Sequence, residues 1–464
     1  MTLASGAYAV SERATSPELR WAARTLARHA GERRPIVLTL PAPVVDPLAM
    51  PPLEAAREAT VWLPPRGPAV VTAGSLRELS ARGHDRFSDL RRGAEALFRE
   101  LAHDRHPAAP AHAPRLFGGL AFAPGAADTH SWTGFGDALF TLPRWTYAVT
   151  DDAASLSVAV DGRELSVEGR LRLLRAIEDH LEAFREERCA AAPRPRVAST
   201  VHVDRQAFRQ AVRRILAAVA AGEVQKVVTA RRSVVTLDGA ADPLAILSGL
   251  RARFPGCTTF AFRRAGADFL GATPEHLVTK REGRVWSEAL AGSTPAGRPA
   301  AREGLLTSRK DRVEHGLVAE AVASGLSPFC LRLERQPTGI RALPHVLHLC
   351  TPIVGWLREA VHVLDVAAAL HPTPAVAGVP RERALAWIAA DEPSPRGWYA
   401  APVGWFDGTG DGELVVALRS GLLRGSMAHL YAGAGIVEGS DPDDEYDETS
   451  VKLRALLEAL GVNP

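Results

Sequence analysis

The passage from residue 204 to residue 237 constrains the fold most strongly, because a helical pattern there gives way directly to a strand pattern. Apolar residues recur at helical spacing after Asp204, which can cap a helix, and Gly222 is placed to end the helix. The β-rich run QKVVTARRSVVTL (225–237) follows at once, so Lys226 is predicted at the start of a strand. This succession indicates a mixed α and β fold.

The rest of the chain shows the same mixture of elements and one candidate boundary. A helical stretch is predicted near 86–103 and a charged amphipathic helix around 168–187. The segment CAAAPRPRVAST (189–200), with two prolines and several small residues, suits a linker. We therefore divide the chain there into an N-terminal half, residues 1–197, and a C-terminal half, residues 198–464.

Charge and hydropathy narrow the classes of partner. The 55 basic and 53 acidic side chains give a net charge of +2, which offers no support for binding nucleic acid or an anionic membrane. No stretch approaches the ~18 apolar residues of a membrane span, and the N-terminus lacks a signal-peptide pattern. We expect a cytoplasmic protein without a membrane span and with a small-molecule partner. Its oligomeric state stays open, and a monomer is compatible with the sequence.

The cysteines give no sign of a metal site or a disulfide framework. Cys189, Cys257, Cys330 and Cys350 are widely spaced and form no CxxC pair. We expect reduced, buried thiols.

Lysine is nearly absent. The basic residues are almost all arginine, and the lysines are Lys226, Lys280, Lys310 and Lys452. An ammonium group can lose its proton more readily than a guanidinium, so each remaining lysine marks a place where that property can matter.

The last predicted helix, from about residue 440 to residue 460, gathers charged side chains on one face. Glu445, Glu448 and Lys452 lie at i, i+3 and i+7, which confines them to an arc of roughly 60°. One interpretation is a solvated acidic first turn that complements the helix dipole. The other is a functional face.

A predicted helix that starts at Ser308 repeats the pattern, with Asp311 and Glu314 at i and i+3. Two carboxylate pairs on separate helices could converge on a hard cation. Magnesium prefers oxygen ligands and keeps several waters, so one or two carboxylates plus a substrate carboxylate would complete its shell. A surface position for this pair is the alternative.

Arg419 and the glycines of YAGAGI (431–436) indicate an anionic ligand. Arginine binds carboxylates in a two-pronged fashion, and glycines leave backbone N–H groups uncovered. A plain tight turn and an exposed arginine are the alternatives.

Lys226 and Glu275 could form a base and acid pair, provided that burial lowers the pKa of the lysine and raises that of the glutamate. His348 is polar among apolar neighbours, so a hydrogen-bonded core histidine and a substrate contact are both open.

Ten segments follow one another in order through residues 225–452: QKVVTARR, FLGATPEHL, ALAGSTPAG, SRKDRVEH, LPHVLHLCTPIVG, LHPTPAVAGVP, RGWYAAPVGW, VVALRS, YAGAGIV and SDPDDEYDETSVK. Together they resemble the chorismate-utilising enzyme family, and within it the isochorismate synthases of menaquinone and siderophore pathways. The segments LFGGLAFAPG (116–125) and FTLPRW (140–145) extend the resemblance more loosely into the first half.

The resemblance implies an acid–base reaction without a redox cofactor. Lys226 would deprotonate the water that attacks ring carbon 2 of chorismate, while Glu275 would protonate the hydroxyl that leaves carbon 4. The implied substrate-binding residues are Ser293 near the ring carboxylate, Arg419 and the Gly433 amide at the enolpyruvyl carboxylate, and Lys452, His348, Ala375 and Tyr399 around the substrate.

The resemblance also implies Mg²⁺ as cofactor. Glu314 and Glu448 would bind the ion, Asp311 and Glu445 would support its shell through waters, and the ion would bind the ring carboxylate.

Relatives with other products differ at particular positions. Ammonia-using relatives that form anthranilate lack the lysine equivalent to Lys226, and relatives that form aminodeoxychorismate carry a lysine where this chain has Ala291. Salicylate-forming relatives share Lys226 and Glu275 but typically have threonine at the position of Ala375. Isochorismate is therefore the expected end product.

Three alternatives remain. The residue types at Tyr399 and Leu418 also occur in pyruvate-eliminating relatives, so a salicylate synthase is the nearest one. The others are a catalytically silent chorismate-binding subunit, which would have no need of Lys226 and Glu275 together, and an unrelated magnesium enzyme.

The implied fold is one large α/β (α+β) unit like that of anthranilate synthase component I. Two mainly antiparallel sheets would face each other, helices would pack outside, and the site would lie between the sheets. The linker near 190–200 would then separate two intertwined halves of that unit.

Overall fold

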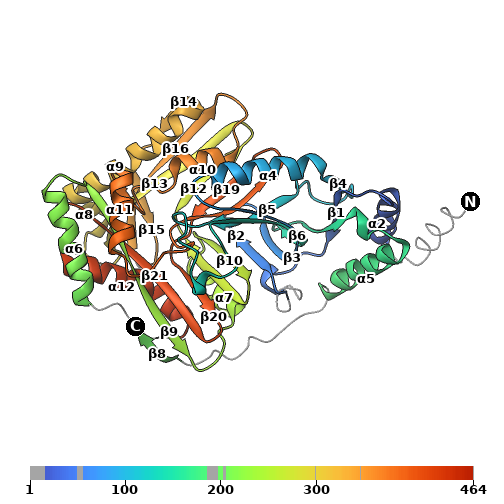
Figure 1. Cartoon of the computed structure of the whole chain (residues 1–464), viewed down its shortest axis with the longest axis horizontal. Coiled ribbons are helices and arrows are strands. Elements are labelled where there is room, and N and C mark those ends of the chain that lie inside the picture. Colours follow the sequence, from blue (N-terminus) through green and yellow to red (C-terminus); the bar gives the residue numbers. More distant parts are fainter. Residues whose placement is uncertain are drawn as a thin grey trace, which may run out of the picture.

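The computed structural model describes residues 16–49, 56–184, 197–201, 205–297, 299–344 and 346–462. Its helices and strands alternate along the chain (Figure 1). The helices are α2 (Pro17–Arg28), α4 (Arg86–Glu100), α5 (Val167–Ala183), α6 (Arg205–Ala220), α7 (Pro243–Arg253), α8 (Ala301–Thr307), α9 (Arg309–Leu326), α10 (Val363–Leu370), α11 (Arg381–Asp391) and α12 (Pro442–Ala459). The strands are β1 (Pro35–Ala42), β2 (Ala59–Leu63), β3 (Ala69–Ala81), β4 (Ala102–Arg105), β5 (Arg115–Leu120), β6 (Ala138–Val149), β7 (Ala154–Asp161), β8 (Val197–Val201), β9 (Lys226–Leu237), β10 (Thr258–Arg264), β11 (Ala267–Thr273), β12 (His276–Arg281), β13 (Arg284–Pro295), β14 (Cys330–Arg335), β15 (Gly339–Ala342), β16 (Val346–Leu357), β17 (Gly378–Val379), β18 (Pro402–Asp407), β19 (Gly412–Val416), β20 (Ser420–Arg424) and β21 (Met427–Ile436).

Backbone hydrogen bonds join the described strands into one mainly antiparallel network. A path of antiparallel pairings runs β9–β21–β20–β11–β10–β2–β3–β6–β5–β18–β19–β12–β13–β16. A branch leads from β6 through β7 and β1 to β4, and the β1–β4 pair is parallel. The predicted fold class, mixed α and β with mainly antiparallel strands, is therefore confirmed. The resemblance implied two sheets, whereas the described strands form one connected network.

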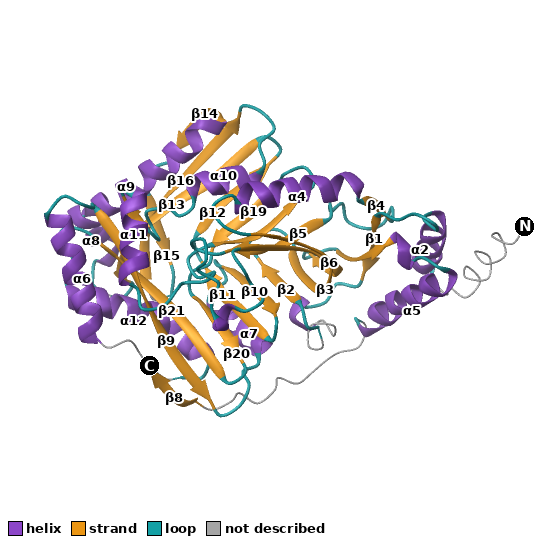
Figure 2. Cartoon of the chain, in the orientation of Figure 1, coloured by secondary structure: helices purple, strands orange, loops and turns teal. Residues whose placement is uncertain are grey.

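Alternation along the strands buries both faces of the network. In β1, Ile36 and Leu38 belong to one hydrophobic cluster, while Val37 belongs to another on the opposite face. In β2, Val61 and Trp62 likewise belong to different clusters on opposite faces. Helices cover the outside of the strands (Figure 2), with α9 packed on β13 and α12 on β21.

The local predictions around residue 225 are confirmed. Helix α6 spans Arg205–Ala220, Gly222 follows it with a φ of +73°, and β9 starts at Lys226. A positive φ suits glycine, which has no Cβ to clash. The predicted cap Asp204 lies outside the described residues.

The predicted linker and the end of the preceding helix need correction. Helix α5 ends at Ala183 and does not reach residue 187, and Val197–Val201 form β8, which pairs with β9. Edge pairing can recruit a short segment whose composition suggests a loop. Residues 185–196 lie outside the described part of the chain. Strands from both sides of this segment pair with each other, β2 with β10 and β5 with β18.

The three cysteines among the described residues are free, buried thiols, as predicted. Cys257, Cys330 and Cys350 are free and buried, and Cys189 lies outside the described residues. Within the described ranges, no helix combines the length and apolar character that crossing a bilayer requires.

Candidate active site

A cavity of about 910 Å³, including the space at its mouth, lies between the two ends of the strand path. Strands β9 and β21 supply one wall, and β13 and β16 supply the other. Every residue predicted for the site except Lys226 lines this cavity: Glu275, Ser293, Asp311, Glu314, His348, Ala375, Tyr399, Arg419, Gly433, Glu445, Glu448 and Lys452. Residues far apart in the sequence thus converge as expected.

Lys226 does not line the cavity itself, but it contacts Glu314, which does. Its side chain is 1% exposed, and its Nζ donates a hydrogen bond of 2.8 Å to Glu314 Oε1. Gly435 makes room for the pair, because a Cβ there would lie 2.7 Å from Glu314 Oε1 and 2.8 Å from Lys226 Cε. Burial alone would raise the pKa of Glu314, but Lys226, with Lys452 and Lys310, lowers it. Glu314 is therefore a carboxylate.

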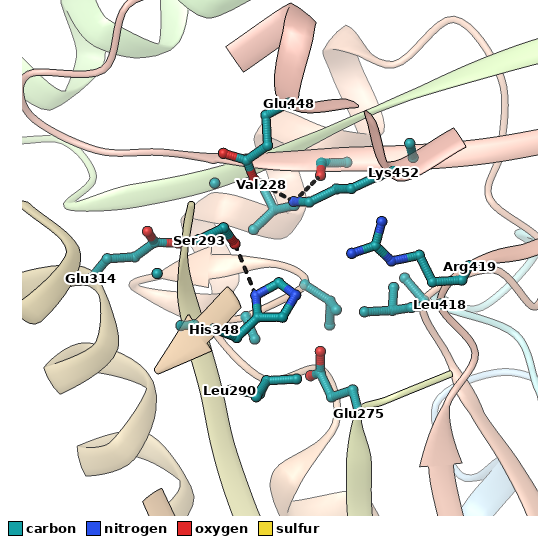
Figure 3. Close-up of a pocket in the computed structure, with 18 of the residues that line it drawn as sticks. Val228, Glu275, Leu290, Ser293, Glu314, His348, Leu418, Arg419, Glu448 and Lys452 are labelled. Atoms are coloured by element: carbon teal, nitrogen blue, oxygen red, sulfur yellow. Dashed lines mark hydrogen bonds and ion pairs between the residues drawn. The ribbon is translucent and has the colours of Figure 1, made fainter. Parts of the chain in front are cut away.

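Glu275 is held in the short connection between β11 and β12. Its N–H donates to Thr273 Oγ1 at 3.2 Å, and its carbonyl accepts from the Val416 N–H at 3.0 Å. Burial, reinforced by the negative charge of Glu288, raises the pKa of Glu275 to about 8 in spite of the surrounding cations. Glu275 is therefore a neutral acid at pH 7, and its carboxyl group points into the cavity (Figure 3).

Arg419 presents an unpaired cation to the same space. In the described part of the chain its guanidinium has no carboxylate partner, whereas the other lining cations do: Lys310 with Glu445, Lys452 with Glu448 and Arg396 with Glu392. Arg419 has a φ of +48°, an unfavourable backbone conformation that costs on the order of 1–3 kcal/mol for a non-glycine residue. The backbone directs the Arg419 guanidinium into the cavity, where a bound anion would form an ion pair with it.

Three of the four candidate metal carboxylates form ion pairs with lysines. Glu314 pairs with Lys226, Glu448 with Lys452 at 2.6 Å, and Glu445 with Lys310 at 2.9 Å. Burial raises the pKa of Glu445 and also that of Asp311. No three acidic, histidine or cysteine side chains among the described residues gather closely enough to hold a metal ion by themselves.

This donor set nevertheless fits a magnesium ion that takes part of its shell from the substrate. Magnesium is commonly bound by one or two protein carboxylates, with waters and substrate oxygens at the other positions. Glu314 and Glu448 offer two carboxylates on the lining of one cavity, and they lie on helices α9 and α12.

A β-bulge directs Ser293 and His348 into the cavity. The register of β13 against β16 shifts between Ala291 and Ser293, where Gly292 has a φ of +74°. Ser293 Oγ and His348 Nδ1 are 3.0 Å apart, and His348 Nε2 has no hydrogen-bond partner among the described residues (Figure 3). Burial lowers the pKa of His348 well below its usual value, so the ring is neutral. A neutral imidazole can donate or accept toward a ligand.

The backbone amide of Gly433 points away from the neighbouring strand. The Ala230 N–H, opposite Gly433, donates to Glu392 Oε1, and the Gly433 carbonyl accepts from Lys452 Nζ at 2.9 Å. Gly433 therefore occupies a non-hydrogen-bonded position of the ladder, where both of its polar groups face outward from β9. Two positions along, Gly435 shares this face.

Among the lining residues that were not predicted for the site, three bear on its charge or shape: Lys310, Arg396 and Gly435. The period of two along β21 could have placed Gly435 beside Gly433, and the scarcity of lysine could have singled out Lys310. Arg396 is buried and donates to the carbonyls of Val376 and Val228, so it links the segment before β17 to strand β9, which no local pattern reveals.

Comparisons with known proteins agree on one family. A family model described as chorismate binding enzyme matches residues 22–461. The chain is 36% identical over 359 residues to isochorismate synthase MenF of Bacillus subtilis, a match that covers 75% of each chain. It is 38% identical over 406 residues to the salicylate biosynthesis isochorismate synthase of Pseudomonas aeruginosa, covering 83% of this chain and 82% of the relative.

A solved structure shares the fold over nearly its full length. The menaquinone-specific isochorismate synthase MenF from Escherichia coli aligns with a TM-score of 0.77 and 26% sequence identity, covering 96% of this chain and 100% of that one. The resemblance predicted from the sequence is confirmed.

Proposed function

Because the chain belongs to the chorismate-binding enzyme family, we propose that it is an isochorismate synthase, an isomerase that adds water at ring carbon 2 of chorismate and expels the hydroxyl from carbon 4. The observation that carries the proposal is the pairing, in one cavity, of a buried carboxyl that stays protonated at neutral pH, Glu275, with an unpaired cation, Arg419. The first suits a departing hydroxyl and the second suits a substrate carboxylate.

Lys226 and Glu275 divide the proton transfers. Lys226 Nζ takes a proton from the attacking water as its oxygen bonds to carbon 2. Glu275 gives its proton to the oxygen on carbon 4, the double bonds shift, and water leaves. One proton enters Lys226 and one leaves Glu275, so the enzyme returns to its starting state by passing a proton between them or through solvent.

The two ends of the substrate have separate binding groups. Arg419 and the Gly433 amide take the enolpyruvyl carboxylate, with Lys452 close by. Ser293 and His348 lie toward the ring carboxylate, and Tyr399, stacked on Tyr431 with ring centroids 5.1 Å apart, borders the ring.

Mg²⁺, held by Glu314 and Glu448 with Asp311 and Glu445 in support, would supply positive charge to the ring carboxylate. Its binding would compete with Lys226 for Glu314 and with Lys452 for Glu448. Lys226, the ion-pair partner of Glu314, is the proposed base.

Ala375 favours isochorismate as the product. It lines the cavity with a methyl group at the position where the resemblance places threonine in pyruvate-eliminating relatives. Tyr399 and Leu418, which also line the cavity, are shared with those relatives and give the salicylate alternative its support.

The test is chromatography of the products after incubation of the purified protein with chorismate, first with Mg²⁺ and then with excess chelator. Isochorismate without pyruvate, formed only with the metal, is the expected result. Salicylate with pyruvate would move the protein to the eliminating enzymes, and unchanged chorismate under both conditions would make it a silent binder.

A further inference from the structure

An ion pair outside the cavity contacts the backbone on both sides of Glu275. Arg341 lies on β15 and Glu288 on β13, and the two side chains meet in a two-pronged contact, with Arg341 Nη2 at 2.7 Å from Glu288 Oε2. Neither residue lines the cavity, and both come from strands that flank β16. The pair was not recognisable as part of the site from the sequence.

Each partner also holds a peptide group next to Glu275. Arg341 Nη1 donates to the carbonyl of Pro274 at 2.9 Å. Glu288 Oε1 lies 3.4 Å from the N–H of His276, which donates to it. The ion pair therefore fixes the backbone on both sides of the residue, and Glu275 has little freedom to turn.

The charge of Glu288 also acts on Glu275. The Glu288 side chain is 9% exposed, so its field is weakly screened by water. After burial it is the main influence that raises the pKa of Glu275, against Lys226, Lys452 and Arg419, which lower it. Cys350, 3.8 Å from Glu288 Oε2, stays a neutral thiol, because burial and Glu288 raise its pKa to about 12.

We infer that Glu288 and Arg341 are positioning residues for the acid of the reaction: their ion pair holds the peptide groups on both sides of Glu275 and so fixes where its carboxyl points, and the charge of Glu288 acts on that carboxyl. The inference rests on the proposed role of Glu275. It assigns a function to two side chains that do not line the cavity.

Glu288→Gln tests the charge, because glutamine keeps the size and the acceptor oxygen. Removing the negative charge lowers the pKa of Glu275, so the acid loses its proton at a lower pH. The basic limb of the pH profile of kcat/KM should move to lower pH, with activity retained at acid pH. The matched control is Glu320→Gln, which removes the exposed partner of Arg335 and should leave the profile unchanged.

Arg341→Lys tests the geometry, because it keeps the cation beside Glu288 but loses the fork that also reaches Pro274. We expect kcat to fall roughly 10- to 100-fold, since small misplacements of a reacting group have effects of that size, while KM changes less than about threefold. Arg335→Lys is the control. Thermal unfolding of each variant separates loss of fold from loss of position.

The outcomes distinguish the inference from the proposed function. If the wild-type protein makes no isochorismate, the proposed function fails. If it does, and folded Glu288→Gln and Arg341→Lys variants keep the wild-type pH profile and kcat, the positioning inference alone is wrong. If Glu288→Gln does not fold, Arg341→Lys decides the matter by its kcat against its KM.

Discussion

Burial and neighbouring charges shift the pKa values of two glutamates in the cavity in opposite directions. Glu275 is buried next to another carboxylate and stays protonated, whereas Glu314 is surrounded by lysines and stays ionised. Two glutamates on one lining thus have different states at the same pH. This separation suits one to proton donation and the other to binding a cation.

The state of Glu275 predicts the basic limb of the pH profile. As the proposed acid, Glu275 would act in its protonated form, and its pKa is raised to about 8, so kcat/KM should fall as pH rises through that value. Glu275→Gln should lower kcat on the order of 10²–10⁴-fold. Steady-state kinetics between pH 6 and pH 10 measure both effects, and a wild-type rate that stays level past pH 9 would contradict the assignment.

Lys226→Met should remove the proposed base and leave Glu314 without its ion-pair partner. We expect a rate loss on the order of 10²–10⁴-fold and some loss of stability, since breaking a buried pair costs roughly 3–5 kcal/mol where water cannot enter. Lys280→Met is the control, because Lys280 is also buried and ion-paired, with Asp411, but lies away from the cavity. Its activity per folded molecule should match wild type. Wild-type turnover in Lys226→Met would show that another group is the base.

Arg419→Gln should weaken substrate binding. Losing a charge-assisted hydrogen bond costs about 1.5–3 kcal/mol, which corresponds to a Kd roughly 10- to 150-fold higher. Calorimetric titration of chorismate into the inactive Glu275→Gln variant, with and without Arg419→Gln, measures the difference. Equal affinities would place the carboxylate elsewhere.

At the scale of elements, strand β21 combines an open backbone face with space for the Lys226–Glu314 pair. Gly435→Ala should cost some stability, because the new Cβ would lie 2.7 Å from Glu314 Oε1 and 2.8 Å from Lys226 Cε, so this buried pair must shift. It should displace that pair and lower kcat roughly 100-fold. Gly249→Ala in α7 meets nothing within 4 Å and should leave kcat unchanged while stabilising the helix by about 0.5–1 kcal/mol. Equal kcat in both variants would refute the role of Gly435.

Element by element, the sequence predicted what depends on local pattern. Helix α6, strand β9 and the faces of α9 and α12 follow from residue spacing, and the ordered segments brought Glu275, His348 and Arg419 together. Strand β8 was missed, because its pairing with β9 comes from a distant part of the chain. The lysine–carboxylate pairs and the Glu288–Arg341 contact were missed for the same reason: each joins elements whose approach only the folded chain defines.

At the scale of the whole molecule, strands of the N-terminal half pair with strands of the C-terminal half. Residues 198–464 alone would lose β2 beside β10 and β5 beside β18, and so would expose unpaired strand edges and part of the shared hydrophobic core. We expect this fragment to aggregate or to unfold without cooperativity, and the full chain to unfold cooperatively. Circular dichroism during heating checks this, and a cooperative transition in the fragment would mean that the second half folds independently.

The cavity lies between the two ends of one continuous strand path, and the short connection from β11 through Glu275 to β12 also joins those ends. Adjacent strands are rotated by roughly 20–25° relative to each other, and these rotations add along the sheet. A change of twist at β3 or β6 would therefore add to the rotations of the other strand pairs and change the angle between the two cavity walls. Strands β2, β3, β6 and β5 of the first half therefore belong to the framework of the cavity, although none of their residues lines it.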